Sequence, residues 1–281
     1  MKKQDDKIKQ DFYALLEKPG KDENDIQNFL ECNSELIPLP FLLGHQLHFN
    51  CIISKFKLGN EFVTDFAYLT KCSDYWEFVL IELEEADKKI FTKNQEKICF
   101  TADFNNSYDQ LTSWKAYVDQ NKNAILEKIE KLRVPLGENP IRFKYVLIIG
   151  RNNEKQDFEK RTKMFAQRCS EDTKIMTYDS IISSYEYRPY STPKLILAPW
   201  KDKGFRIKNV PAVVDTNIFA HMTTEYLKVD KAEVEQLKKQ DYQIDAWLEG
   251  SMLTINCKYD KKTFGQRTTN PLFKAVCRDV N

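Results

Sequence analysis

An unbroken apolar run at residues 78–81, followed by three glutamates within four residues, constrains the fold of this chain more than any other feature. Phe78-Val-Leu-Ile81 lacks the alternation of a half-exposed strand, so it is typical of a central strand covered on both faces. Glu82-Leu-Glu-Glu85 then puts charge at the end of that strand. The run therefore predicts a sheet between helices, with carboxylates at the carboxyl end of a buried strand.

Helical and strand patterns alternate over the first 190 residues. Helices are expected at 8–17, from 26 with Asp25 as the cap, at 108–132, at 155–168 and from 179. Strands are expected at 46–56, 62–69, 76–83, 142–149 and 174–177, the first two joined in a hairpin by the turn at Leu58-Gly59-Asn60. This order predicts an α/β fold with a mixed sheet flanked by helices.

The sequence beyond Tyr190 lacks the long helical and strand patterns of the first 190 residues. Pro193, Pro199 and Pro211 break the chain into short pieces, so we expect one domain at 1–190 and a small C-terminal accessory region at 191–281. Only a helix at 231–239 and a strand at 252–257 are expected in that region, too little to predict its fold.

Composition favours a protein of the cytoplasm. No stretch approaches the roughly 20 apolar residues that a membrane span needs, and the first residues lack the apolar run of a signal peptide, so no membrane partner is expected. Seven cysteines without a Cys-x-x-Cys pair indicate reduced thiols. His45 and His48 have a spacing that suits a metal on a helix, but Gly44 and the preceding prolines favour a loop that enters a strand.

Charge is distributed unevenly along the chain, although the formal net charge is only +1. Residues 74–110 carry nine Asp and Glu against four Lys, whereas residues 141–208 carry fifteen Lys and Arg against eight Asp and Glu. A layout of this kind suits a metal-dependent enzyme that acts on a polyanion, because carboxylates bind the cation and basic side chains bind phosphates. Ordinary solvated surface charge gives the same counts.

Three carboxylates are candidates for a metal site. Glu82 and Glu84 are two apart on a strand and therefore project to the same face. Asp65 is expected in the middle of an apolar strand, where an isolated acid is costly without a cation or hydrogen-bond donors. If the two strands are neighbours, the oxygens converge into the hard ligand set that Mg²⁺ or Mn²⁺ prefers. Such an ion lowers the pKa of a bound water and neutralises a phosphate. The alternative is that these acids are solvated at strand ends.

These residues resemble a known family of nucleases. Asp65 followed by Glu82-x-Glu84 resembles the P-D-(D/E)-x-K core of restriction-endonuclease-like nucleases, and Gln110-Leu-Thr-Ser-Trp114 is similar to their Gln-x-x-x-aromatic motif. More specifically, the order of motifs from about 24 to 185 resembles the Shedu anti-phage defence nucleases. The matching segments are Thr64-Asp-Phe-Ala-Tyr, Trp76-Glu-Phe-Val-Leu-Ile-Glu-Leu-Glu, Lys89-Ile-Phe-Thr-Lys, Gln110-Leu-Thr-Ser-Trp, Val146-Leu-Ile-Ile-Gly-Arg151 and Ile175-Met-Thr-Tyr-Asp-Ser-Ile.

The resemblance implies a restriction-endonuclease-like fold and a metal-dependent DNA endonuclease of bacterial immunity that works as a homo-oligomer, with nicking and double-strand cleavage both open. Asp65 and Glu82 would be metal ligands, and Gln110 would approach the site from its helix. Glu31 would match an acid on the first helix of such sites. Because an active nuclease must be restrained in its own host, a phage-derived activator is expected as a further partner.

One residue departs from the superfamily pattern. Glu84 stands where a lysine is usual, which adds negative charge beside two carboxylates. Either Glu84 is itself a metal ligand, or a lysine such as Lys57 or Lys89 supplies the missing positive charge. Arg151 and the basic helix after it are further candidates for contact with the DNA backbone.

Two rival functions stay open. The first is a catalytically silent module of the same fold that binds DNA ends or a phage protein. The second is an enzyme that acts on RNA or a nucleotide.

Overall fold

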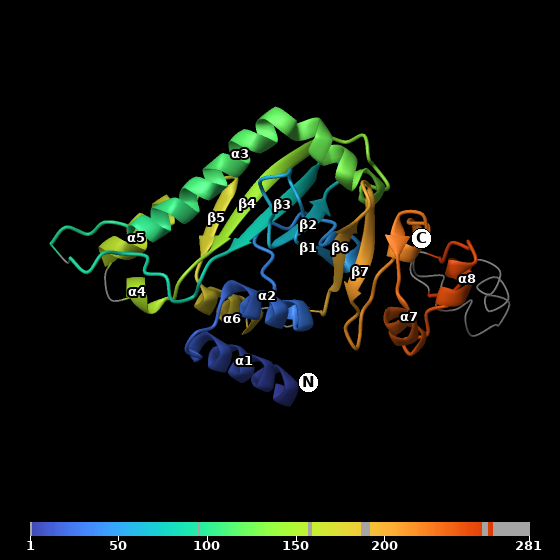
Figure 1. Cartoon of the computed structure of the whole chain (residues 1–281), viewed down its shortest axis with the longest axis horizontal. Coiled ribbons are helices and arrows are strands. Elements are labelled where there is room, and N and C mark those ends of the chain that lie inside the picture. Colours follow the sequence, from blue (N-terminus) through green and yellow to red (C-terminus); the bar gives the residue numbers. More distant parts are fainter. Residues whose placement is uncertain (1, 95, 157–158, 187–191, 255–257, 261–281) are drawn as a thin grey trace.

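The apolar run forms the middle of a strand that is buried along its whole length. This strand, β3 (Trp76–Leu83), has the predicted bounds. The structure is a computed structural model, and it describes residues 2–94, 96–156, 159–186, 192–254 and 258–260. It confirms the predicted α/β class with a mixed sheet flanked by helices, consistent with a restriction-endonuclease-like fold (Figure 1).

Eight strands form one sheet in the order β5-β4-β3-β2-β1-β6-β7-β8. Besides β3 they are β1 (Cys51–Ser54), β2 (Phe66–Lys71), β4 (Ile141–Ile148), β5 (Thr173–Met176), β6 (Leu195–Trp200), β7 (Gly204–Asn209) and β8 (Leu227–Lys228). β3, β4 and β5 are parallel, whereas β2 is antiparallel to both of its neighbours. The predicted strands at 76–83, 142–149 and 174–177 are thus confirmed to within one residue at either end.

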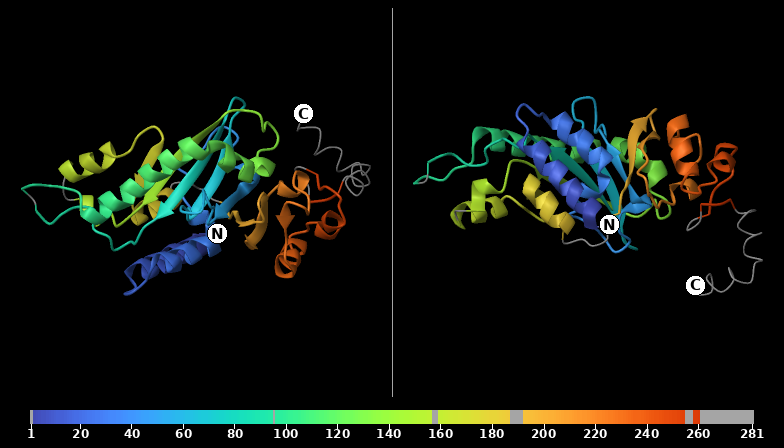
Figure 2. Two further views of the ribbon diagram at one scale, coloured as in Figure 1. Left: turned by 45° about the horizontal axis from the view of Figure 1, so that its top comes forward. Right: turned by 90° about the horizontal axis from the view of Figure 1, so that it is seen from below.

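Helices cover both faces of the sheet. The long helix α3 (Ala102–Ile129) lies over one face, and α1 (Lys2–Glu17), α2 (Glu23–Cys32) and α6 (Tyr178–Glu186) lie over the other (Figure 2). Phe78 and Leu80 belong to the apolar cluster beneath α3, whereas Val79 and Ile81 belong to the cluster beneath α1, α2 and α6. Burial on both faces explains why the run at 78–81 has no polar alternation.

Helices α1, α2 and α3 begin three to six residues earlier than the sequence predicts, and α1 begins at Lys2 and not at residue 8. The cap of α2 is Asp22, whose side chain accepts from the backbone N–H of Asp25, while the Asp25 side chain accepts in return from Asp22. Asp25 is therefore the third helical residue and not the cap. α3 begins at Ala102, six residues before the predicted start, because Thr101 caps it and Phe104 stacks on Phe100 with ring centroids 4.3 Å apart.

The predicted strand at 46–56 is wrong over its first half. A 3₁₀ turn occupies His48–Asn50, and only Cys51–Ser54 pair as β1. The backbone has positive φ at Phe49, Asn50 and Lys55, which ends the extended conformation on both sides of this short strand. The hairpin itself is confirmed, since β1 pairs antiparallel with β2 and Leu58 N–H donates to the carbonyl of Phe62.

The basic helix predicted at 155–168 is also different in the structure. Two short helices take its place, α4 (Asn153–Gln156) and α5 (Glu159–Gln167), with residues 157–158 outside the described part of the chain. No helix among the described residues has both the length and the apolar character that crossing a bilayer demands.

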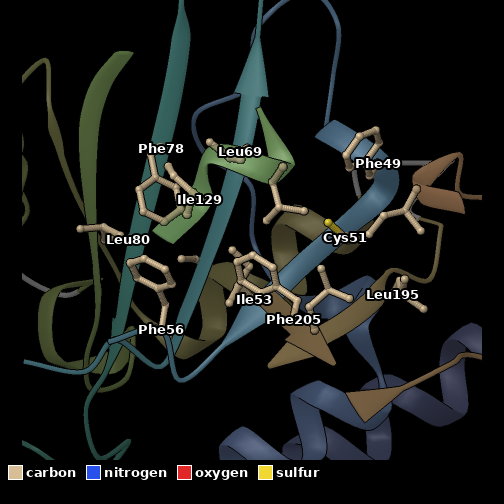
Figure 3. Packing of buried hydrophobic residues seen from close by; sticks show 14 of the residues in the cluster. Phe49, Cys51, Ile53, Phe56, Leu69, Phe78, Leu80, Ile129, Leu195 and Phe205 are labelled. Atoms are coloured by element: carbon tan, nitrogen blue, oxygen red, sulfur yellow. The ribbon is translucent and has the colours of Figure 1, made fainter. Parts of the chain in front are cut away.

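The strands that follow residue 190 extend the same sheet. β6 pairs in parallel with β1, and Leu195 and Phe205 join the cluster that contains Cys51 and Ile53 (Figure 3). α7 (Lys231–Lys238), predicted at 231–239, and α8 (Ile244–Leu248) flank the sheet beyond β7 (Figure 1). Leu253 bridges to Asp260, while residues 255–257 of the predicted strand lie outside the described residues. The division at 190 into a nuclease domain and an accessory region stays a prediction.

One glycine fixes the loop that follows β4 against the loop that follows β3. Gly150 has a φ of +63°, and a Cβ there would lie 2.8 Å from the backbone oxygen of Lys88. Gly150→Ala is therefore expected to lower the free energy of unfolding by about 1 to 3 kcal/mol, measured by urea denaturation. Gly44→Ala is the control, because nothing lies within 4 Å of a Cβ at that position. Equal stability of the two variants would show that the Gly150 loop tolerates the side chain.

Candidate active site

Asp65 and Glu82 lie beside each other where β2 begins and β3 ends. Phe66 pairs with Ile81, and the N–H of Asp65 donates to the carbonyl of Ile81 at 3.1 Å, a register that puts Asp65 opposite Glu82. Residues opposite each other on antiparallel strands have side chains on the same face. Asp65 therefore precedes the strand in which it was predicted, but its strand is the neighbour of the Glu82 strand, as the metal-site hypothesis requires.

Hydrogen bonds fix both the side chain and the backbone of the buried Asp65. Its Oδ1 accepts from Lys55 Nζ at 2.6 Å, and its Oδ2 accepts from the backbone N–H of Leu83 at 2.6 Å. Its carbonyl accepts from the N–H of Lys55 at 2.9 Å. The hydrogen bond to Leu83 holds the aspartate against the end of β3, between Glu82 and Glu84, so the position of this carboxylate is fixed by main-chain atoms of β3.

Glu82 has the most unusual environment in the cluster. Gln110 on α3 donates from Nε2 to its Oε1, so the predicted approach of Gln110 is observed, whereas its Oε2 is buried with no hydrogen-bond partner. Burial, together with the charges of Asp65 and Glu84, raises the pKa of Glu82 to about 10. A buried carboxyl with this pKa keeps its proton at neutral pH, because ionising it would place a third negative charge among its neighbours.

Glu84 is held by main-chain and side-chain contacts. Its N–H donates to the carbonyl of Ile148 at 2.9 Å, its carbonyl accepts from the hydroxyl of Tyr178 at 2.6 Å, and its Oε2 pairs with Lys88 Nζ. Burial lowers the pKa of Lys88, but the hydrogen bond and charge of Glu84 outweigh it, so that pKa is raised overall.

The lysines that offset the carboxylates are not the two that the sequence suggested. Lys89 pairs with Glu154 at 3.0 Å, and Lys57 forms an isolated bridge with Val63 in the hairpin. Lys55 and Lys88 contact Asp65 and Glu84 instead. The hairpin residue Lys55 has a φ of +51°, and Lys88 lies four residues beyond Glu84, two local geometries that sequence patterns do not reveal.

On α2, Glu31 and Glu23 differ in their surroundings. Glu31 accepts from Ser54 Oγ at 2.5 Å and pairs with Lys208 Nζ at 2.6 Å, so it is bound to β1 and β7 and not to the cluster. Glu23, two turns earlier on the same face of α2, is the acid that the cluster affects: burial raises its pKa, and the charge of Glu84 adds to the rise. Gln27 lies between them and donates to the carbonyl of Asp65 at 3.4 Å.

Comparison with known families identifies the chain. The family described as "Shedu protein SduA, C-terminal" matches residues 20–182, which is more than half of the chain and includes Asp65, Glu82, Glu84 and Gln110. The chain belongs to the Shedu family. No curated protein matches it. Membership in the Shedu family indicates a role in anti-phage defence.

Arg151 of this Shedu protein is not the exposed guanidinium that its position after β4 suggested. Its Nη2 pairs with Asp179 at 3.0 Å and its Nη1 with Glu17 at 2.6 Å. Asp179 also accepts from the N–H of Asn152 at 2.6 Å and therefore anchors the Arg151 loop. Arg151 stabilises the junction of α1, α6 and the loop after β4, since its two partners come from the two helices.

The carboxyl groups of the Shedu site are of the type that binds a divalent cation, but they are not arranged around one. Carboxylate oxygens are the hard ligands that Mg²⁺ or Mn²⁺ prefers, and Glu82 Oε2 is buried and unpartnered among them. Within the described ranges, no group of three or more His, Cys, Asp or Glu is placed to hold a metal ion. Asp65 and Glu84 are each turned onto a lysine, so a cation would compete with two ammonium groups for the same oxygens.

Proposed function

We propose that this Shedu protein is a metal-dependent DNA endonuclease of anti-phage defence, with Asp65, Glu82 and Glu84 as its carboxylate ligands. The observation that carries the proposal is the buried, unpartnered Oε2 of Glu82, flanked by Asp65 from the neighbouring strand. A buried carboxyl oxygen without a hydrogen-bond partner costs free energy, and such atoms are characteristic of sites that bind or react. A divalent cation, when bound, would neutralise phosphate charge and lower the pKa of water.

The side chains of the site would have different roles in the proposed reaction. Gln110 would fix the orientation of Glu82 through Oε1 and leave the buried Oε2 available to a ligand. Glu82 holds a proton at neutral pH and must release it before it can bind a cation. Lys55 and Lys88 neutralise Asp65 and Glu84 in the meantime, and when displaced they are positioned to bind DNA phosphate oxygens.

The experiment is a cleavage assay with purified protein in Mg²⁺ and, in parallel, in chelator. Supercoiled plasmid, linear duplex, single-stranded DNA and RNA of matched sequence are the substrates. We expect cleavage of DNA in Mg²⁺ alone, and the ratio of open-circular to linear plasmid separates nicking from double-strand cleavage. Cleavage of RNA but not DNA would contradict the proposed substrate.

A non-catalytic DNA-binding module is a second candidate that one observation favours. Lys55 and Lys88 already neutralise two of the carboxylates, an arrangement that needs no metal. In that case DNA binding would persist in chelator, and no cleavage would occur with Mg²⁺ or Mn²⁺ on any of the DNA substrates.

Cation binding is expected to release a proton. At pH 7.5 Glu82 carries a proton that a bound cation would expel, so titration of Mn²⁺ in two buffers of different ionisation enthalpy should give about one proton released per cation. Glu82→Gln should abolish this release, and Glu85→Gln, an exposed neighbour, should leave it unchanged. Binding of Mn²⁺ without proton release would contradict the assignment of Glu82.

The proposal extends to location and assembly. We expect the protein to act in the cytoplasm on DNA, as a homo-oligomer, under the control of a phage-derived activator. Light scattering coupled to size-exclusion chromatography measures the oligomer directly, and a monomeric mass over the working concentration range would contradict that part.

A further inference from the structure

A polar cleft lies at the ends of β2 and β3 that are opposite to the carboxylates. Its volume is about 530 Å³, and it opens where β2 ends at Lys71 and β3 begins at Trp76. The walls come from two separate parts of the chain, namely 45–50, 71 and 135 within the family match and 215–217, 221 and 258 after it. All three histidines of the protein, His45, His48 and His221, line this one cleft.

Lys71 is a buried cation in the wall of the cleft. The residue is 8% exposed, its Nζ lies 4.8 Å from the ring centroid of Trp76, and the hydrogen bond from Nζ to the carbonyl of Pro135 is long at 3.5 Å. No carboxylate pairs with Lys71 in the part of the chain that the structure describes, and burial lowers its pKa. A buried ammonium group without an anionic partner is costly, and an anion bound in the cleft would offset that cost.

His48 and His221 contribute aromatic rings to the wall of the cleft. His48 Nε2 lies 2.8 Å from the carbonyl of Leu132, which only accepts, so the proton is on Nε2. Burial, with the charge of Lys71, lowers the pKa of His48 to about 3, so the ring is neutral. The half-buried ring of His221 stacks on Phe49, with centroids 5.3 Å apart and planes 27° apart. His221 is therefore a planar, rigidly backed ring in the wall of the cleft.

The remaining charged groups lie nearer to solvent. Lys258 donates to the carbonyl of Gln240 at 2.9 Å and lies over the ring of Tyr242. Asp215 is exposed and is the single carboxylate among the described lining residues. The cleft thus has two ammonium groups, one carboxylate and one supported aromatic ring.

We propose that this cleft binds a nucleoside phosphate. The phosphate would lie between Lys71 and Lys258, the base against the His221 ring, and a ribose hydroxyl would donate to the Asp215 carboxylate. A bare phosphate would leave the His221 ring and Asp215 without a role. The cleft volume is within the range of small-molecule sites. Because the C-terminal region supplies Asp215, His221 and Lys258, ligand binding would couple that region to the Shedu domain.

The test is calorimetry on the full chain in chelator, where metal-dependent binding at the carboxylates does not contribute. The probes are AMP, inorganic phosphate and adenosine. AMP is expected to bind at least about tenfold more tightly than either of the other two, because each of them lacks one of the two recognised parts. No binding of AMP at millimolar concentration, or equal binding of AMP and phosphate, would overturn the proposal.

Substitutions at two residues separate the parts of the site. Lys71→Gln should weaken AMP and phosphate alike by about tenfold or more, whereas His221→Ala should reduce AMP binding to the level of phosphate, and His221→Phe should retain it. Lys155→Gln is the matched control, a half-buried lysine over the ring of Phe165 that does not line the cleft. Thermal melting checks that each variant is folded. Wild-type affinity in both Lys71→Gln and His221→Ala would overturn the assignment.

Discussion

Asp65→Asn is expected to reduce Mg²⁺-dependent DNA cleavage by about a thousandfold without unfolding the protein. The amide oxygen of asparagine can still accept from the N–H of Leu83, which preserves the main-chain contact. It lacks the negative charge that a cation requires, and it leaves Lys55 without its anionic partner. The loss should therefore appear in the rate of cleavage and not in the fold, as initial rates on supercoiled plasmid and circular dichroism would report.

Asp109→Asn provides the matched control for this variant. Asp109 is exposed on α3, directly before Gln110. Its substitution removes the same charge at a position outside the cluster. We expect wild-type cleavage from it. If Asp65→Asn cleaves at the same rate as Asp109→Asn, Asp65 is not a ligand and the proposed site is wrong.

Glu82→Gln is expected to abolish cleavage and, at alkaline pH, to stabilise the protein. The pKa of Glu82 is about 10 in the folded state, against an ordinary value of 4.5, so between these values the folded chain binds a proton that the unfolded chain has released. The contribution of this group to the stability of the wild type is complete below about 4.5 and is lost as the pH rises toward about 10. Glutamine is neutral at every pH, so the variant does not lose stability in this way as the pH rises.

The stability difference between Glu82→Gln and the wild type should therefore grow with pH, by an amount on the order of 2 to 4 kcal/mol between pH 5 and pH 9. Urea denaturation at the two pH values measures it, and Glu85→Gln, an exposed neighbour, should show no such growth. A difference that is constant with pH would mean that Glu82 is ionised in the folded protein and that its environment is not the one described.

The sequence predicts the middle of the fold better than its edges. β3 is predicted with its observed bounds because four consecutive apolar residues indicate a strand that is buried on both faces. β6 and β7 are not predicted, because β6 contains Pro199 and because both depend on the pairing of β6 with β1 across more than a hundred residues of chain. Pairings of that kind depend on tertiary structure and leave no local periodicity.

The candidate site shows the same division. Asp65, Glu82 and Gln110 are indicated by motif spacing, and the register between β2 and β3 brings the two acids together. Glu23 and the two lysines are missed. The assignment of the α2 cap to Asp25 puts Glu23 outside the helix, whereas Asp22 as the cap makes it the first helical residue. Lys55 contacts Asp65 only because the hairpin has a left-handed residue at that position.

The most direct test is anomalous diffraction from crystals of the protein soaked in Mn²⁺. The account predicts a manganese peak bound by Asp65 and Glu82, with the ammonium groups of Lys55 and Lys88 displaced from the carboxylates. Crystals in which both lysines keep their ion pairs, with no manganese between the aspartate and the glutamate, would contradict it.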